Sequence, residues 1–157
     1  MNVEQIMKQR VRACRRDDSL NAAAQIMWEN DCGCVPVLDE DDRVVGMVTD
    51  RDICMAAYTQ GGALWTLKVA NAMSPKLYTC KGENSVAEAE EIMRTNQVRR
   101  LPVVNEEGRL VGIVSLNDIA SEAEPQRGRK KREVTFAEVG ETLKAICRAR
   151  EVASVAA

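Results

Sequence analysis

Apolar positions along the chain alternate between helical spacing and short runs of β-forming residues. Ser19 is a favourable N-cap, and the residues after it place apolar side chains on one helical face. Residues 34–38 and 44–49 are two such β-forming runs joined by a polar turn, which predicts a β-hairpin. A second helix is expected to begin near Asp50. The pattern predicts a unit made of an extended entry, a helix, a hairpin and a helix.

The same unit occurs twice in the chain. Residues 19–57 match residues 85–123 without a gap, at a constant offset of about 66 residues. The second copy therefore has its own capped helix after Ser85, its own hairpin and a second helix from about Leu116. A unit of about 55 residues is too small to bury a good core alone. We expect the two copies to pack on each other.

A proline interrupts the first strand of each predicted hairpin. Pro36 and Pro102 occupy equivalent positions in the two copies. Proline has no backbone N–H to donate within a sheet, and it is found mainly in edge strands or at bulges. The pattern therefore predicts an edge or irregular strand at both places.

The repeat divides the chain into five segments. Residues 3–60 form the first copy, 61–68 a linker, and 69–123 the second copy. Residues 124–134 carry a basic run, which is short and lacks aromatic residues and is therefore expected to be a solvated linker. Residues 135–152 predict a C-terminal helix whose apolar stripe packs on the module or on a partner subunit.

Composition removes several classes of function. The chain has 157 residues, of which 45% are hydrophobic, and its net charge of -2 argues against nucleic-acid binding through the whole surface. It contains no histidine, which excludes Ser-His-Asp and Cys-His nucleophile pairs and zinc sites that use imidazole. It also lacks a P-loop. We expect no catalytic residue and no enzyme activity.

No apolar run approaches the roughly 18 residues of a membrane-spanning helix, and residues 1–10 lack the apolar core of a secretory signal. We expect a cytoplasmic protein that does not contact a membrane. Its six cysteines are then expected to be free thiols. Cys32 and Cys34, with Cys14 and Cys54 nearby, could form a metal site or redox switch, but buried apolar cysteines explain the pattern more simply.

A hydroxyl and a carboxylate stand three residues apart where each hairpin leads into its second helix. The pairs are Thr49 with Asp52 and Ser115 with Asp118. At a helix N-terminus such side chains lie beside free backbone N–H groups, which attract anions, and a carboxylate can accept both hydroxyls of a ribose. The same spacing is an ordinary capping box. The motif by itself is compatible with capping alone or with nucleotide binding.

The ordered set of motifs, present twice, resembles the CBS domain. In the first copy it comprises Pro36 and Val37 followed by Gly46-x-Val48-Thr49-x-x-Asp52, and the second copy repeats it at the common offset. The resemblance covers about residues 3–123. It implies an α+β fold of two β-α-β-β-α repeats packed through their sheets, known as a Bateman module. Such modules often dimerise and bind adenosine-containing ligands in clefts between the repeats.

The resemblance also implies a set of ligand contacts. The Thr or Ser hydroxyl is expected to contact phosphate, the Asp to hold the ribose, and apolar neighbours to hold adenine. Arg99 and Arg100 are expected either to face phosphates or to be solvated, and the two sites should differ in affinity. The expected contacts are Val11, Cys34, Val35, Pro36, Thr49, Arg51 and Asp52 in the first copy, and Leu77, Arg99, Arg100, Leu101, Pro102, Ser115, Asn117 and Asp118 in the second.

The resulting hypothesis is a regulatory module that binds AMP, ADP or ATP, with S-adenosylmethionine or NAD as other ligands of the same class. Binding would change the geometry of a homodimer or the activity of an unidentified partner protein. Two other readings stay open. One is a protein-interaction module in which Asp52 and Asp118 only cap helices, and the other is a cysteine-based metal or redox sensor.

Overall fold

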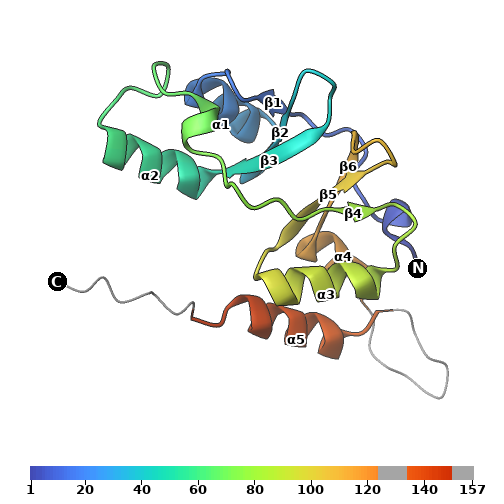
Figure 1. Ribbon diagram of the computed structural model, residues 1–157. Helices are drawn as coiled ribbons and strands as arrows, with labels where there is room; N and C mark the ends of the chain where they lie inside the picture. The colour runs from blue at the N-terminus through green and yellow to red at the C-terminus, as the bar shows by residue number, and fades with distance from the viewer. Residues whose placement is uncertain (124–133, 150–157) are drawn as a thin grey trace, which may run out of the picture.

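A computed structural model describes residues 1–123 and 134–149, and shows the α+β architecture that the sequence predicts (Figure 1). The first copy contains η1 (Val3–Gln5), β1 (Cys14–Arg15), α1 (Leu20–Glu29), β2 (Cys34–Leu38), β3 (Val44–Thr49) and α2 (Asp50–Gln60). The second contains η2 (Val69–Asn71), β4 (Cys80–Lys81), α3 (Val86–Asn96), β5 (Arg100–Val104), β6 (Leu110–Ser115) and α4 (Leu116–Glu122). Helix α5 (Phe136–Ile146) follows, so the predicted C-terminal helix is confirmed. The basic run at residues 127–132 lies outside the described residues.

Each copy forms a three-stranded sheet, in the order β1-β2-β3 and β4-β5-β6. The first two strands of each sheet run parallel, and the last two form the predicted antiparallel hairpin. The registers are the same in both copies, since Cys14 lies opposite Val37 and Cys80 lies opposite Val103. The duplication seen in the sequence is therefore a duplication of the sheet as well.

Of the two alternatives predicted for the proline strands, the edge strand is wrong and the irregular strand is confirmed, because the pairing register shifts between Val37 and Leu38 and between Val103 and Val104. Pro36 and Pro102 lie in β2 and β5, which are the central strands of their sheets. The short strand β1 pairs with β2 only at Val37 and Leu38, after the proline, and β4 pairs with β5 at the equivalent positions. No ladder bond toward the short strand is needed from the proline nitrogen, so a central strand tolerates it.

The entry segment of each copy is the stretch before its short first strand, residues 3–13 in the first copy and 69–79 in the second. Each entry segment packs into the core of the other copy. Val3 is fully buried in the cluster formed by the second copy, and Val69 is fully buried in the cluster formed by the first. The Val3 N–H donates to the Asn84 carbonyl at 2.9 Å, and the Val69 N–H donates to the Asp18 carbonyl at 2.9 Å. Neither core is completed by the contiguous residues of its own copy, which agrees with the small size of the unit.

Two buried glycines allow this exchange of entry segments. A β-carbon at Gly112 would lie 2.6 Å from Met7 Sδ and 3.0 Å from the Lys8 carbonyl oxygen. A β-carbon at Gly46 would lie 2.5 Å from Met73 Cε. The constraint is stricter at Gly112, where the contact is with a backbone oxygen, than at Gly46, where the nearest backbone atom is the Ser74 carbonyl oxygen at 3.3 Å and the methionine end can move.

Helix α5 lies against the outer helices of the second copy (Figure 1). Thr135 caps it and forms the predicted capping box with Glu138. Thr142 is fully buried, and its hydroxyl donates to Glu90 Oε1 at 2.9 Å and accepts from Arg94 Nη1 at 3.1 Å. Only part of the apolar stripe packs on its own module, since Val139 and Ile146 lie against the core of the second copy whereas Phe136 and Leu143 are exposed. Within residues 1–123 and 134–149, no helix has the length and apolar character needed to span a membrane.

Glu90 gives the α3–α5 contact a dependence on pH. Burial raises the pKa of the Glu90 carboxyl above its usual value, although the Thr142 hydroxyl and the Arg94 charge act in the opposite direction. Between its unfolded pKa and this raised folded pKa, the folded state binds more protons than the unfolded state. The free energy of unfolding therefore falls as the pH rises through that window.

We expect Glu90→Gln to abolish this decrease in the free energy of unfolding with rising pH. The glutamine keeps an acceptor oxygen for Thr142 but cannot ionise. Urea unfolding of both proteins between about pH 4 and pH 8 measures the effect. Glu91→Gln is the matched control, since Arg94 holds the pKa of the exposed Glu91 carboxyl below its usual value. Glu91→Gln should have a lower free energy of unfolding than the wild type above the usual pKa of glutamate, because the ionised Glu91 stabilises the folded state there. A Glu90→Gln curve parallel to the wild-type curve would contradict the assignment.

Candidate functional site

The hydroxyl and carboxylate of each repeated motif are hydrogen-bonded at a strand-to-helix junction. Asp52 Oδ2 accepts the Thr49 backbone N–H at 2.9 Å and the Thr49 hydroxyl at 2.8 Å, and the Asp52 N–H donates to Thr49 Oγ1 at 3.2 Å. Ser115 and Asp118 repeat the three bonds at 2.8, 2.5 and 3.2 Å. The capping role weighed for these residues is therefore confirmed. Both carboxylate bonds in each copy end on Oδ2, so Oδ1 can accept hydroxyls from a ligand.

The entry segment brings a cation to the second motif. The Lys8 ammonium lies 3.8 Å from Asp118 Oδ1. Lys8 reaches this position because its backbone forms a β-bridge with Ile113 in β6, with N···O distances of 2.9 and 3.0 Å. Sequence reasoning missed Lys8 because it belongs to the first copy in the chain but lies at the second copy in space. The only available signal was Gly112, which indicated a close approach without naming the segment.

The two apolar residues chosen from the entry segments lie where these segments pass from one copy to the other. Val11 is half-buried. Along the chain it lies between Lys8, whose backbone bridges to the second copy, and Cys14, whose strand pairs within the first copy. Leu77 is half-buried at the equivalent place in the other entry segment. Both residues therefore stand between the two sheets.

The apolar residues chosen from the strands lie deeper. Val35 and Leu101 have no exposed surface, and Pro36, Pro102 and Cys34 are buried as well. Their packing in the cores is the plain structural role considered for them. In the chain without ligand, the half-buried entry residues offer the accessible apolar surface of the site.

Arg100 reaches across the module to the first copy. It begins β5 opposite Ser115, but a β-carbon at Gly33 would lie 3.6 Å from Arg100 Nη2 and 3.2 Å from Asp50 Oδ2. Its charge also acts to lower the pKa of the Cys34 thiol, against the larger effect of burial. The sequence places Arg100 with the second motif, whereas the structure places its guanidinium beside the start of β2.

The other polar residues chosen for the site lie on the surface. Arg99 is exposed, and its carbonyl accepts the Leu116 N–H at 3.0 Å where α4 begins. Arg51 and Asn117 are exposed at equivalent positions in the first turns of α2 and α4. All three side chains are free to turn toward a ligand bound at the neighbouring motif.

All six cysteines are free thiols, and three of them are buried. Burial raises the pKa of Cys14 and Cys80 to about 12 and that of Cys34 to about 11, so these thiols are protonated at neutral pH. Cys54 is exposed on α2. In the part of the chain that the structure describes, no three histidine, cysteine or acidic side chains are grouped to hold a metal ion.

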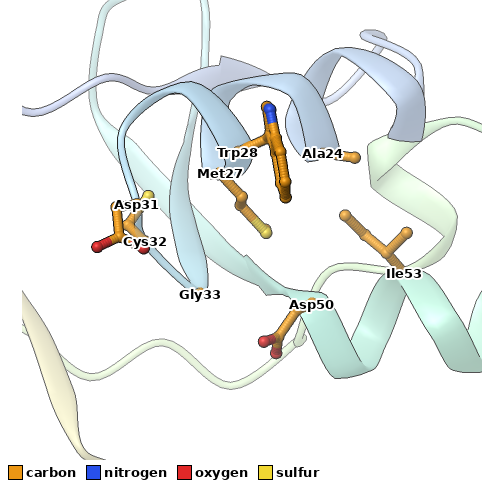
Figure 2. A pocket seen from close by; sticks show the side chains of 8 residues that line it. All are labelled: Ala24, Met27, Trp28, Asp31, Cys32, Gly33, Asp50 and Ile53. Carbon is orange, nitrogen blue, oxygen red and sulfur yellow. The ribbon is translucent and has the colours of Figure 1, made fainter.

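A hollow of about 580 Å³ lies on the outer side of the first copy, between α1 and α2 (Figure 2). It is lined by Ala24, Met27, Trp28, Asp31, Cys32, Gly33, Asp50 and Ile53. Only Asp50 belongs to the repeated motif, and Thr49 and Asp52 do not line the hollow. The hollow therefore reaches the first turn of α2 at Asp50 but not the hydrogen-bonded pair of Thr49 and Asp52.

Two equivalent sheets, crossed entry segments and a duplicated helix-capping motif define a tandem-repeat module. The family model of the CBS domain matches residues 3–58 and 69–124, and the chain belongs to this family. Hypoxic response protein 1 of Mycobacterium tuberculosis is 39% identical over 73% of this chain and 80% of that protein. The inosine-5'-monophosphate dehydrogenase of Methanocaldococcus jannaschii is 34% identical over 74% of this chain, but the match spans only 22% of that enzyme.

Solved structures agree with this assignment. The structure of Hypoxic Response Protein I with two coordinated zinc ions has a TM-score of 0.72 and 36% identity, and covers 79% of this chain and 100% of that one. The CBS domain pair of protein MJ0100, in complex with 5'-methylthioadenosine and S-adenosyl-L-methionine, has a TM-score of 0.69 and 25% identity. It covers 77% of this chain and 98% of that one. The chain is thus a CBS domain pair with an added C-terminal helix.

Proposed function

We propose that this CBS domain pair is a regulatory module that binds an adenosine-containing ligand and performs no chemical step. The observation that carries the proposal is the motif at Ser115 and Asp118, where a hydroxyl and a carboxylate meet Lys8 from the other entry segment. The adenosyl ligands in the structure of the MJ0100 pair support the same class of ligand.

The residues at the second motif fit the parts of a nucleotide. Asp118 Oδ1 would accept ribose hydroxyls, while the Lys8 ammonium and the Ser115 hydroxyl would contact a phosphate. Leu77 would provide apolar surface for adenine. Because Lys8 and Ser115 come from different copies, one bound ligand would contact both copies.

The two motifs differ in charge, and we propose that they differ in ligand. The first motif carries two carboxylates, Asp50 and Asp52, with Arg51 between them. The second has the uncharged Leu116 and Asn117 at the positions of Asp50 and Arg51, and it has Lys8 beside it. Phosphate-bearing nucleotides such as AMP, ADP and ATP should favour the second motif, and S-adenosylmethionine, whose sulfonium is positive, should be better tolerated at the first.

Signalling would follow from contacts that span the two copies. A ligand that binds one arrangement of the copies more tightly than another shifts the population toward that arrangement, and only this difference in affinity transmits a signal. We propose that the response is read by a regulated partner protein or through a homodimer. The buried thiols fit the reducing conditions of the cytoplasm, where we place the protein.

Removing the Asp118 carboxylate should weaken the tightest nucleotide binding. Titration calorimetry with AMP, ADP, ATP, S-adenosylmethionine and NAD is expected to show binding that Asp118→Ala weakens by about 10- to 100-fold for the phosphate-bearing ligands, as for the loss of charge-assisted hydrogen bonds. Asp52→Ala should leave that site intact and weaken only binding at the first motif.

Loss of a helix cap needs its own control, because each aspartate also caps a helix. Ser85 and Glu88 form the same capping box at the start of α3. Glu88→Ala should lower the stability of the protein, as the aspartate variants do, without changing ligand affinity. Binding that survives in both aspartate variants would mean that these residues only cap. No heat with any ligand in the folded protein would favour a protein-interaction module.

A further inference from the structure

The segment between α1 and β2 carries two cysteines that the proposed function does not use. Cys32 and Cys34 stand on either side of Gly33. The second copy has Val98 and Arg100 at the positions of the two cysteines, and its hairpin has the same pairing register. The fold therefore does not require cysteine at either position, and the pair is a feature of the first copy alone.

The two thiols differ in how easily a solute reaches them. Cys32 is half-buried and lines the hollow beside Asp31 (Figure 2). Cys34 is the first residue of β2, and only 5% of its surface is exposed. Cys32 is accordingly the thiol that a small oxidant in solution meets first, while Cys34 is shielded from it.

The spacing of the two cysteines allows a disulfide between them. The Cα atoms of residues two apart are separated by at most about 7 Å, which is the upper limit that a disulfide spans. Gly33 lacks a β-carbon, so its backbone can bend to bring the two sulfurs together. Burial raises the pKa of the Cys34 thiol to about 11, Arg100 acts to lower it, and Cys32 acts to raise it. The two thiols thus lie within electrostatic range of each other in the reduced protein.

The backbone between the cysteines is joined to the start of α2. Cys34 pairs with Thr49 across the hairpin, and the Asp50 N–H donates to the Gly33 carbonyl at 3.4 Å. A β-carbon at Gly33 would lie 3.2 Å from Asp50 Oδ2 and 3.6 Å from Arg100 Nη2, so the segment is closely surrounded. A bend at Gly33 therefore displaces the first turn of α2.

We propose that Cys32 and Cys34 form a peroxide-sensitive thiol pair, which closes to a disulfide and loosens the junction between β2 and α2. The Cys32 thiolate attacks the O–O bond of a hydroperoxide, so that an S–O bond forms and the protonated alcohol, or water from hydrogen peroxide, leaves. The Cys34 sulfur then attacks the Cys32 sulfur. The S–S bond forms as the S–O bond breaks, and the departing hydroxide takes the Cys34 proton to leave as water. Two electrons pass from the thiols to one peroxide.

Peptide mapping of the folded, reduced protein after treatment with hydrogen peroxide tests the proposal. No lysine or arginine occurs in residues 17–42, so cleavage after Arg16 and Arg43 releases one peptide that contains both cysteines and no other. This peptide should lose two hydrogen atoms and stop reacting with an alkylating agent. The Asp50 amide should exchange hydrogen faster in the oxidised protein, because its bond to the Gly33 carbonyl is weakened. A dithiol reductant should reverse both changes.

Single variants separate the roles of the two cysteines. Cys34→Ala should stop the reaction at the sulfenic acid of Cys32, which dimedone then labels in the same peptide, whereas Cys32→Ser should give neither the label nor the disulfide. Cys54→Ser is the matched control, since Cys54 is an exposed thiol of the same copy, and it should form the disulfide like the wild type. Circular dichroism verifies that each variant is folded.

Three results would overturn the proposal. They are a wild-type peptide that keeps both thiols after peroxide has oxidised Cys54, a disulfide that forms only in urea, and unchanged exchange of the Asp50 amide in the oxidised protein. All three are read on the wild type, so they decide the question even where a Cys34 variant does not fold. Because no ligand enters the experiment, its result is independent of the proposed function.

Discussion

Val3→Asp is expected to destabilise the second copy by about 3–5 kcal/mol, although Val3 begins the first copy. Val3 is 0% exposed and packs in the core that includes Val86 and Leu101. A carboxylate at this place would be buried among apolar side chains without a cation. Because domains of this size have only about 5–15 kcal/mol of stability, the change should remove a large part of it.

Hydrogen exchange can locate the damage within the module. In Val3→Asp, the backbone amides of β5 and β6 should exchange faster than those of β2 and β3, because the core of the first copy contains Val69 in place of Val3. Val111→Asp is the matched control, since Val111 is 38% exposed in β6 and its replacement should cost less than 1 kcal/mol. Faster exchange in β2 and β3 alone would show that the entry segment packs on its own copy.

Gly112→Val should have the second large effect, with a loss of about 3 kcal/mol and weaker ligand binding. The flexible Met7 side chain can move away from a new β-carbon, but the Lys8 carbonyl at 3.0 Å belongs to the bridged backbone and cannot move alone. Displacing Lys8 also takes its ammonium away from Asp118. Denaturant unfolding measures the first consequence, and titration calorimetry measures the second.

Gly140→Ala is the control for replacing a glycine. Gly140 lies in α5, and a β-carbon there would meet no atom within 4 Å. Alanine favours the helix over glycine, so this variant should gain about 0.5–1 kcal/mol and should leave ligand binding unchanged. If Gly112→Val proved as stable as the wild type, the close approach of the entry segment would not be a constraint on the fold.

Much of the local structure could be predicted from the sequence. The helices begin at Ser19, Thr49, Ser85 and Ser115 because each of these residues caps the first turn, and this preference acts within a few residues of chain. The hairpins follow from alternating β-formers and polar turns for the same reason. The central position of the two proline strands could not be predicted in this way. Whether a strand lies at the centre or the edge of a sheet depends on its neighbouring strand, which here is more than 20 residues away along the chain.

The candidate site could be predicted only in part. The motif residues Thr49, Asp52, Ser115 and Asp118 are contiguous, so their pattern identified them and their capping bonds followed. Lys8 does not belong to any local pattern, and its position depends on the path of the entry segment. Arg100 was assigned to its own copy because sequence gives no information on how far a long side chain reaches across an interface.

The sequence by itself determined the duplicated unit, its helices and hairpins, and the family to which the chain belongs, because these depend on periodicities and motifs within each copy. Tertiary structure alone decided which copy each entry segment joins. Val3 and Val69 are identical, as are Gly46 and Gly112, so local pairing and exchanged pairing satisfy the same residues. In the folded chain Val3 is buried in the core of the second copy and Val69 in the core of the first. The bonds of Thr142 with Glu90 and Arg94 likewise hold α5 on the second copy, because those two residues have no equivalent in the first.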